Sequence, residues 1–364
     1  MSDLDLLYTD IEDALRSSIR DLLADRCAPD SVTALYDGDR SIVDGLWKAL
    51  AVDIGVAGLL VPEDRGGLGA SAREAAVVLE ELGRAVAPLP FLTSAVVATT
   101  ALADTDGELI GQLATGERTA ALLVPLSTAP SGVLPTVSVL GGKLSGTVTS
   151  VAGVLEADTL LVPAATADGM ALYSVPAADA LLAQVVSLDM TRQLADVTLD
   201  DTAATLLIED AEPAIRRALQ AGAALLASEQ VGLGRWCLDT TLGYLKQRRQ
   251  FGRVVGGFQA LKHRLADLAT SLDCATAAAR YAAATLAADD PDCAIAAAIA
   301  QAYCSDFAVT AAEEAVQLHG GIGMTWEYPV HLYLKRAKAD QITFGTSGSH
   351  RAQLAQLVNL PTPG

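Results

Sequence analysis

The chain has 364 residues, of which 51% are hydrophobic and only 4% aromatic. This length exceeds what one core usually organises, so we expect two or three packed regions built on aliphatic side chains. The formal net charge is −19, and such a field repels nucleic-acid backbones, which excludes nucleic acid as a partner. An anionic cofactor held by local arginines is not excluded.

Cysteine content, the first residues and the apolar runs restrict the class of protein further. The five cysteines are an odd number without a Cys-x-x-Cys pair, so neither a disulfide framework nor a zinc site is predicted. The start, Met1 to Asp5, is acidic, unlike the basic start of a signal peptide. Charged and polar residues interrupt the Ala-rich stretches, so we expect no membrane span. The sequence therefore predicts a cytoplasmic protein.

Residues 1–116 are predicted to form a helical domain. Apolar residues recur at helical spacing from Leu6 to Leu22 and from Ile42 to Ile54. Three glycines within residues 66–69 predict a loop. The segment Ser71–Glu74 has the Ser-x-x-Glu pattern of a capping box, so a new helix should begin there.

The residue pattern changes from helical spacing near residue 117, and residues 117–208 are predicted to form a small β domain. Short β-rich runs alternate there with turn residues such as Gly141-Gly142 and Asp200-Asp201. Residues 209–364 return to helical spacing, with one apolar stripe from Leu261 to Ala279. The predicted fold class is therefore α+β, in the order helix, β, helix.

Four segments carry a pattern that becomes specific when they are taken together. They are VPEDRGGLG at residues 61–69 with VLEELGR at 78–84, RRQFG at 248–252 with FQALKHRLAD at 258–267, QLHGGIG at 317–323, and WEYPV at 326–330 with LKRA at 334–337. In this order, over nearly the whole chain, they resemble the acyl-CoA dehydrogenase family.

The resemblance implies a fold, a cofactor and a reaction. The fold has a helical domain (residues 1–116), a β-barrel-like domain (117–208) and a four-helix bundle (209–364). The cofactor is FAD, the substrate is an acyl-CoA thioester, and an electron-transfer flavoprotein accepts the electrons. In such enzymes a carboxylate removes the α-proton of the thioester while the β-hydrogen leaves as hydride to the flavin. The α-proton is weakly acidic, so the reaction needs a positioned base and a polarised carbonyl.

This chain departs from the family at the base. Counted without gaps from Gln317, Phe344 stands where relatives carry the Glu of a Tyr-Glu-Gly-Thr-like segment, and a phenyl ring accepts no proton. Relatives that place the base on an earlier helix would carry it at Gly222. Glu229 and His350 remain as displaced bases. The alternatives are an interhelical polar contact or a charge facing a partner for Glu229, and a surface position for His350.

Unlike the base positions, the residues that the resemblance assigns to FAD match the family pattern. They are Arg248, Phe251, Gln259, Gln317, Gly320, Gly321 and Thr346. The Arg248 guanidinium suits a pyrophosphate, and the two glycines allow close approach of the backbone. In relatives this set reaches the FAD of a neighbouring subunit. Taken singly, Arg248 could be a helix-end charge, Phe251 a core residue and the glycines a helix cap.

The segments that would face this chain's own flavin ring are altered. Relatives show a Thr-Glu-Pro-type segment where residues 124–130 carry no Glu, and a Trp where residues 142–150 have none. The chain thus resembles the base-lacking subunit of heteromeric actinobacterial acyl-CoA dehydrogenases of steroid and lipid breakdown.

Three functions follow as hypotheses. The first is a subunit that completes the FAD site of a sister subunit bearing the catalytic Glu, in an α2β2 heterotetramer. The second is a homo-oligomeric dehydrogenase that uses Glu229 or His350. The third is a non-catalytic scaffold with the same fold. The sequence does not specify the acyl chain.

Overall fold

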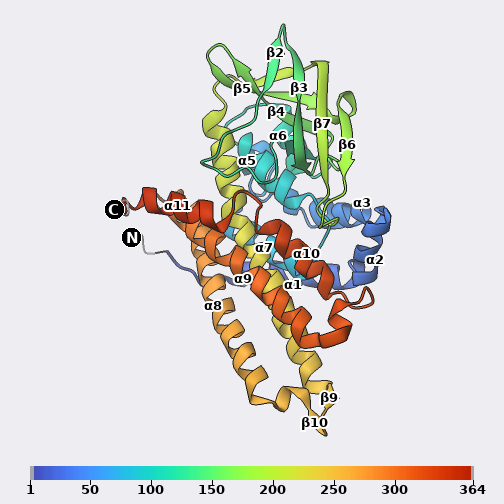
Figure 1. The fold of residues 1–364 in the computed structure, drawn as a ribbon. Helices are drawn as coiled ribbons and strands as arrows, with labels where there is room; N and C mark the ends of the chain where they lie inside the picture. Colours follow the sequence, from blue (N-terminus) through green and yellow to red (C-terminus); the bar gives the residue numbers. More distant parts are fainter. Residues whose placement is uncertain (1–3, 362–364) are drawn as a thin grey trace.

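A computed structural model describes residues 4–361 of the chain; the acidic start noted above lies partly outside them. Figure 1 shows a sheet at one end of the molecule, helices of the N-terminal part beneath it, and long helices of the C-terminal part extending away from it. The predicted order of helix, β and helix is confirmed.

The N-terminal region is helical, as predicted, and is divided into short pieces. Its elements are α1 (Asp10–Arg26), α2 (Pro29–Thr33), η1 (Ala34–Asp37), α3 (Ser41–Trp47), η2 (Lys48–Asp53), η3 (Val56–Gly58), η4 (Glu63–Arg65), α4 (Ala72–Ala85), η5 (Phe91–Ala98), α5 (Thr99–Ala101) and α6 (Glu108–Ala114). The predicted capping box is present. The Ser71 hydroxyl accepts a backbone N–H from the first turn of α4, and the Glu74 carboxylate accepts the backbone N–H of Ser71.

The middle of the chain forms one sheet of eight strands. They are β1 (Ala120–Leu122), β2 (Val137–Leu140), β3 (Lys143–Ala152), β4 (Thr159–Thr166), β5 (Gly169–Pro176), β6 (Leu181–Val185), β7 (Leu194–Ala203) and β8 (Thr205–Ile208), with η6 (Ala177–Asp179) before β6. The strand order is β6-β7-β3-β2-β4-β5-β8, and β1 pairs with β4. Pairing is antiparallel except where β1 and β2 run parallel to β4. Among the described residues no ladder joins the terminal strands β6 and β8.

The C-terminal region is a bundle of long helices. Its elements are α7 (Glu212–Gln247), β9 (Arg249–Gln250), β10 (Arg253–Val254), η7 (Val255–Gly257), α8 (Gln259–Ala287), α9 (Cys293–His319), η8 (Gly320–Met324), α10 (Val330–Asp340) and α11 (Ser347–Leu357). The predicted apolar stripe of α8 is confirmed, since Leu265, Leu268 and Leu272 are buried. α7 lies at the centre and packs against α4, α8 and α9.

One segment corrects the expectation that no run is long and apolar enough for a membrane span. Cys293–Met324 reaches the required length and composition, but 67% of its most apolar window is buried inside the protein. The burial explains the composition, because small apolar side chains allow α9 to pack closely within the bundle.

The crossing of α4 and α7 depends on two glycines. A Cβ at Gly83 would collide with the Glu229 carbonyl, and a Cβ at Gly232 would collide with the Glu80 carbonyl. The two helix backbones therefore approach more closely than any larger residue allows. This contact fixes the position of α7, which carries Gly222 and Glu229.

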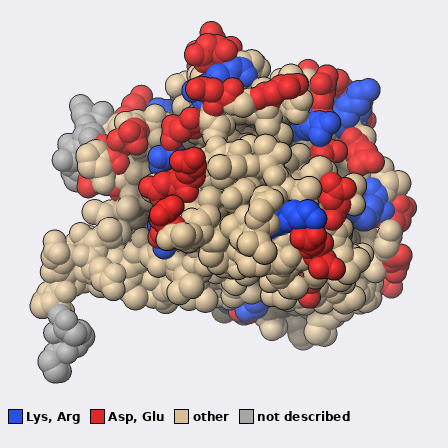
Figure 2. Space-filling view, turned by 90° about the horizontal axis from the view of Figure 1, so that it is seen from above, with Lys and Arg blue, Asp and Glu red and all other residues tan. Residues whose placement is uncertain are grey.

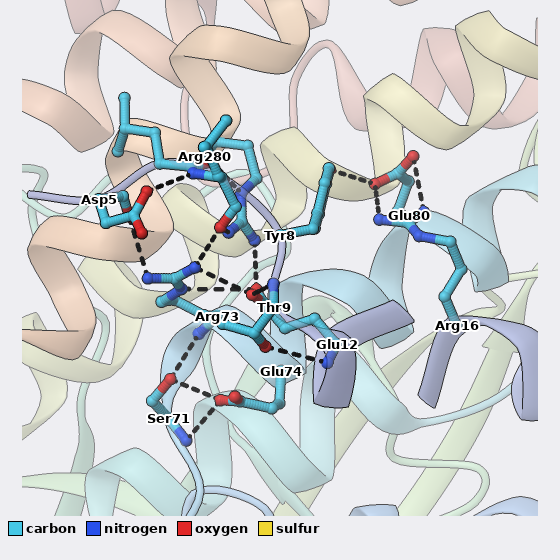
Figure 3. Close-up of polar contacts among 12 residues, drawn as sticks. Asp5, Tyr8, Thr9, Glu12, Arg16, Ser71, Arg73, Glu74, Glu80 and Arg280 are labelled. Atoms are coloured by element: carbon cyan, nitrogen blue, oxygen red, sulfur yellow. Dashed lines mark hydrogen bonds and ion pairs between the residues drawn. The ribbon is translucent and has the colours of Figure 1, made fainter. Parts of the chain in front are cut away.

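A polar cluster attaches the N-terminal segment to the rest of the molecule (Figure 3). The fully buried Glu12 carboxylate accepts hydrogen bonds from Arg73 on α4 and Arg280 on α8. Both arginines also donate to the Leu7 carbonyl. Burial would raise the pKa of Glu12, but the bonds from Arg280 and Arg73 lower it to about 2.

Acidic side chains dominate the surface. Figure 2, which views the molecule from above, shows clusters of Asp and Glu around this face with fewer Lys and Arg between them. The view agrees with 44 acidic against 25 basic residues in the chain. Arginines that bind an anion must therefore act locally, against the field of the whole molecule.

Candidate functional site

Phe344 and Gly222, the two positions at which the resemblance would place a base, lie against each other in the interior. Phe344 is 4% exposed. A Cβ built on Gly222 would lie 2.8 Å from both Cε2 and Cζ of the Phe344 ring, and 3.0 Å from Cγ2 of Val97. The ring occupies the space that a side chain at residue 222 would need. Neither position provides a group that can accept a proton.

The backbone around Phe344 is closed by hydrogen bonds to the sheet region. The Phe344 N–H donates to the Leu126 carbonyl at 2.9 Å, and the Leu126 N–H donates to the Ser150 carbonyl at 3.0 Å. Leu126 and Ser150 belong to the two segments expected to face a flavin ring. Because the Phe344 N–H is used within the protein, it is not free to polarise the carbonyl of a thioester.

His350 lies in the interior, so the expected surface position is wrong. Its side chain is 2% exposed, and its Nε2 lies 2.9 Å from the Phe344 carbonyl oxygen. Because a carbonyl only accepts, Nε2 carries the proton and Nδ1 carries the lone pair. Burial lowers the pKa of His350, and the bond to Phe344 opposes that shift only in part. Nδ1 is buried and has no hydrogen-bond partner among the described residues, so solvent does not reach the atom that could accept a proton.

Glu229 forms the interhelical polar contact that was one alternative to a displaced base. Its carboxylate accepts two bonds from Arg192, at 2.6 and 2.7 Å, and one from Arg336 at 2.5 Å. Burial alone would raise the pKa of Glu229, but the two guanidiniums lower it below its ordinary value. A carboxylate held by two buried arginines is a poor proton acceptor.

Three of the candidate FAD residues lie at the tip of the α7–α8 hairpin, at the bottom of Figure 1. Arg248 is the exposed C-cap residue of α7, and Gln259 is the exposed first residue of α8. Phe251 and Gly252 form the turn between β9 and β10, both with positive φ. Phe251 is 88% exposed, so it is not a core residue.

The other glycine and glutamine candidates lie at the end of α9. Gln317, Gly320 and Gly321 are exposed. Gly320 has φ +65°, a conformation that favours glycine, and a Cβ at either glycine would meet none of the described residues within 4 Å. The backbone of this turn is therefore open to a ligand.

A stack of three rings, with His319 buried and both tyrosines half-buried, joins these two groups and was not anticipated from the sequence. The Tyr244 and His319 rings lie 4.6 Å apart, and His319 Nε2 lies 3.0 Å from the Tyr328 hydroxyl. The Tyr244 carbonyl accepts the Arg248 N–H, and His319 directly precedes Gly320. The stack therefore holds the end of α7 against the end of α9. The sequence showed Tyr328 only as part of a family motif.

Thr346 is separate from this group. It is the N-cap residue of α11, where its hydroxyl accepts the Ser349 N–H at 3.2 Å. In Figure 1 the start of α11 lies well away from β9 and β10. Within one copy of the chain, Thr346 and Arg248 do not contribute to the same site.

The residues at the α7–α9 ends fit a dinucleotide. Within residues 4–361 no carboxylate pairs with Arg248, so its charge is available for a pyrophosphate. Exposed apolar side chains surround the open glycine turn, with Met324 78% and Ile322 41% exposed. The same stretch of chain holds no group of three His, Cys, Asp or Glu side chains suited to a metal ion.

A helical region, a largely antiparallel sheet and a helical bundle, with two opposed base positions inside, define an acyl-CoA dehydrogenase fold. Residues 9–116 match the acyl-CoA dehydrogenase N-terminal domain, and residues 213–358 match the acyl-CoA dehydrogenase C-terminal domain. The chain belongs to the acyl-CoA dehydrogenase family, whose members are FAD-binding flavoproteins.

Relatives are found among mycobacterial proteins. The chain is 36% identical to acyl-CoA dehydrogenase IpdE2 of Mycobacterium tuberculosis over 325 residues, covering 89% of each protein. It is 34% identical to acyl-CoA dehydrogenase IpdE2 of Mycolicibacterium smegmatis, covering 94% of this chain and 96% of that protein.

Two solved complexes are similar in structure. A chain of a variant of the Tcur3481-Tcur3483 steroid acyl-CoA dehydrogenase superposes with a TM-score of 0.84 and 29% identity, covering 96% of this chain and 98% of that one. A chain of the ChsE4-ChsE5 complex from Mycobacterium tuberculosis gives a TM-score of 0.86 and 25% identity, covering 99% and 100%.

Proposed function

We propose that this chain is a subunit of an FAD-dependent acyl-CoA dehydrogenase that supplies FAD contacts, while a sister subunit supplies the catalytic Glu. The observation that carries the proposal is the packing of Phe344 into the notch at Gly222. Neither expected base position carries a carboxylate, and the Phe344 ring fills the space between them. Proton abstraction then needs a base from another chain.

This chain's part of the site would be binding and orientation. Arg248 would neutralise the pyrophosphate of FAD, the turn at Gly320 and Gly321 would approach it with backbone N–H groups, and Phe251 and Gln317 would contact its remaining parts. Bound FAD supplies the hydride-accepting chemistry. The exposure of this set supports a role toward a neighbouring protomer, because a site completed within one chain would bury it.

The partner and substrate follow from the similar proteins. Both solved complexes named above are two-component assemblies, and one is described as a steroid enzyme. We therefore infer an α2β2 heterotetramer in the cytoplasm that oxidises an acyl-CoA thioester with a bulky, steroid-derived acyl chain. An electron-transfer flavoprotein would take up the electrons.

Co-expression tests the proposal. The chain is produced alone and together with a neighbouring-gene relative that keeps the Glu, and flavin content and acyl-CoA oxidation with an artificial acceptor are measured. We expect flavin and turnover only in the complex, and loss of turnover when the partner's Glu is replaced by Gln. Robust turnover by the chain alone would overturn the proposal.

The two other functions make different predictions in the same assays. A homo-oligomer with a displaced base would lose the turnover of the lone chain on Glu229→Gln or His350→Gln. The contacts of both residues favour neither as a base. A scaffold would show no flavin absorbance even in the complex.

A further inference from the structure

Five buried charged side chains form one cluster between the sheet region and the bundle. Asp189 and Arg192 come from the turn before β7, Glu229 from α7, and Arg336 and Asp340 from α10. Each side chain is at most 8% exposed. With two guanidiniums and three carboxyls, the cluster carries one excess negative charge if every carboxyl is ionised.

The three carboxyls are not equally stabilised as anions. Asp189 accepts bonds from the Thr191 N–H, the Thr191 hydroxyl and Arg336 Nε. Glu229 also accepts three, all from guanidiniums. Within residues 4–361 the Asp340 carboxyl accepts one bond, from Arg192 to Oδ1 at 2.5 Å, and its Oδ2 is buried without a partner. A fully buried anion with one hydrogen bond is costly.

No described residue donates to Oδ2 of Asp340, and two acceptor atoms of neighbouring residues are also without donors. The amide Nε2 groups of Gln230 and Gln301 both donate to the Asp340 backbone carbonyl at 3.3 Å. The Oε1 atoms of both glutamines are buried and, like Asp340 Oδ2, have no partner in the part of the chain that the structure describes. One additional proton on Asp340 would supply the missing donor and balance the charge of the cluster.

We propose that Asp340 is a neutral carboxylic acid in the folded protein at neutral pH. Its proton keeps the loop that carries Phe344 in place, and loss of this proton at higher pH loosens the loop. The inference is independent of the proposed function. Apart from the five members, the titratable groups that interact with the cluster include Lys335 of α10 and Tyr36, which act on Asp189, and Cys27, which acts on Arg336.

The electrostatics agree with this assignment. Burial, and after it the charge of Glu229, raise the pKa of Asp340 to about 8, against the two guanidiniums. The ordinary Asp value is 3.8. Between those values the folded chain holds one proton more than the unfolded chain. Stability therefore falls as the pH rises through this interval, and the fall ends once Asp340 ionises in the folded state as well.

The protonation state of Asp340 would affect the loop through hydrogen bonds of Thr343. The Asp340 carbonyl accepts the Thr343 N–H at 3.2 Å, and Gln301 donates to the Thr343 carbonyl at 3.0 Å. Phe344 follows directly. Ionisation of Asp340 places an unbalanced charge under these bonds and loosens the loop.

Asp340→Asn tests the proposal, because it keeps the shape and removes the titration. The unfolding equilibrium constants of the wild-type chain and the variant are measured in urea at fixed protein concentration, from about pH 5 to about pH 9. We expect the wild-type to variant ratio to rise about tenfold per pH unit and to level off near the raised pKa. Asp239→Asn, which changes an exposed carboxylate, should give a constant ratio. A constant ratio for Asp340→Asn, or one that falls with rising pH, would overturn the proposal.

Infrared spectroscopy of the wild-type chain keeps the proposal testable if Asp340→Asn does not fold. The difference spectrum between about pH 6 and about pH 9 should contain the carbonyl stretch of a buried carboxylic acid that disappears on alkalinisation. Burial also raises the pKa of Glu156, so Glu156 is a second possible source of such a band. If the band belongs to Asp340, it should persist in Glu156→Gln. Absence of the band in the wild type, or its loss in Glu156→Gln, would refute the assignment to Asp340.

Discussion

The contact between Gly222 and Phe344 predicts a strong coupling between two substitutions. In Gly222→Ala the new Cβ would lie 2.8 Å from the Phe344 ring. Overpacking of a core costs about 1–3 kcal/mol, while Ala is favoured over Gly inside a helix by about 1 kcal/mol. The net destabilisation should therefore be about 0–2 kcal/mol. Phe344→Ala alone should cost about 3–5 kcal/mol, because it empties a buried site.

The double variant separates these effects. Once the ring is absent, Gly222→Ala keeps its helical advantage and, of its three nearest contacts, retains only the one with Val97, so it should stabilise by about 1 kcal/mol. The coupling free energy should thus be about 1–3 kcal/mol in favour of the double variant. Gly243→Ala on the same helix is the control, because its Cβ would meet no atom of residues 4–361 within 4 Å.

The assay is denaturant unfolding of all variants at one protein concentration, with and without the control substitution. Gly243→Ala should add about 1 kcal/mol equally in both backgrounds. If Gly222→Ala behaves like Gly243→Ala, with coupling below about 0.5 kcal/mol, the two base positions do not converge as described.

Three further predictions use other parts of the molecule. Gly232→Ala should lower the free energy of unfolding by about 3 kcal/mol, since its Cβ would collide with the Glu80 carbonyl; a change under about 1 kcal/mol in urea unfolding contradicts the close crossing. Glu12→Gln should lower the free energy of unfolding by about 3 kcal/mol near neutral pH. This loss should become smaller as the pH falls from 4.5 toward 2, because the lowered pKa of Glu12 contributes its full stabilisation only above that interval. A pH-independent cost in melting experiments would exclude the ion pair with Arg280 as its source. Arg248→Gln in the co-expressed complex should weaken FAD binding about tenfold to a hundredfold, as loss of charge-assisted bonds predicts; unchanged flavin fluorescence on dilution would remove Arg248 from the site.

Local patterns in the sequence predicted much of the secondary structure. The box at Ser71–Glu74 and the stripe from Leu261 to Ala279 involve residues three or four positions apart, so the helical backbone itself brings them together. The change of residue pattern near residue 117 likewise preceded the first strand, which begins at Ala120. The positions of the domain boundaries stay a prediction.

The missing base was evident from the sequence, because the absence of a carboxylate at Phe344 and Gly222 needs no coordinates. The contact between these two residues was not evident. They are far apart in the chain, and only the packing of α7 against the loop before α11 places the ring in the glycine notch. The same applies to His350, which looked like a surface residue on a short helix.

The sequence by itself determined the family, the order of helical and β regions, and the identity of the side chains that can carry charge or accept protons. Only the tertiary structure decided which of those groups are available. Among the described residues, Glu229 is held by two arginines, Oδ2 of Asp340 has no donor, and Arg248 has no carboxylate partner. The reason is that hydrogen-bond satisfaction and desolvation depend on neighbours from distant segments, and local patterns contain no information about those neighbours.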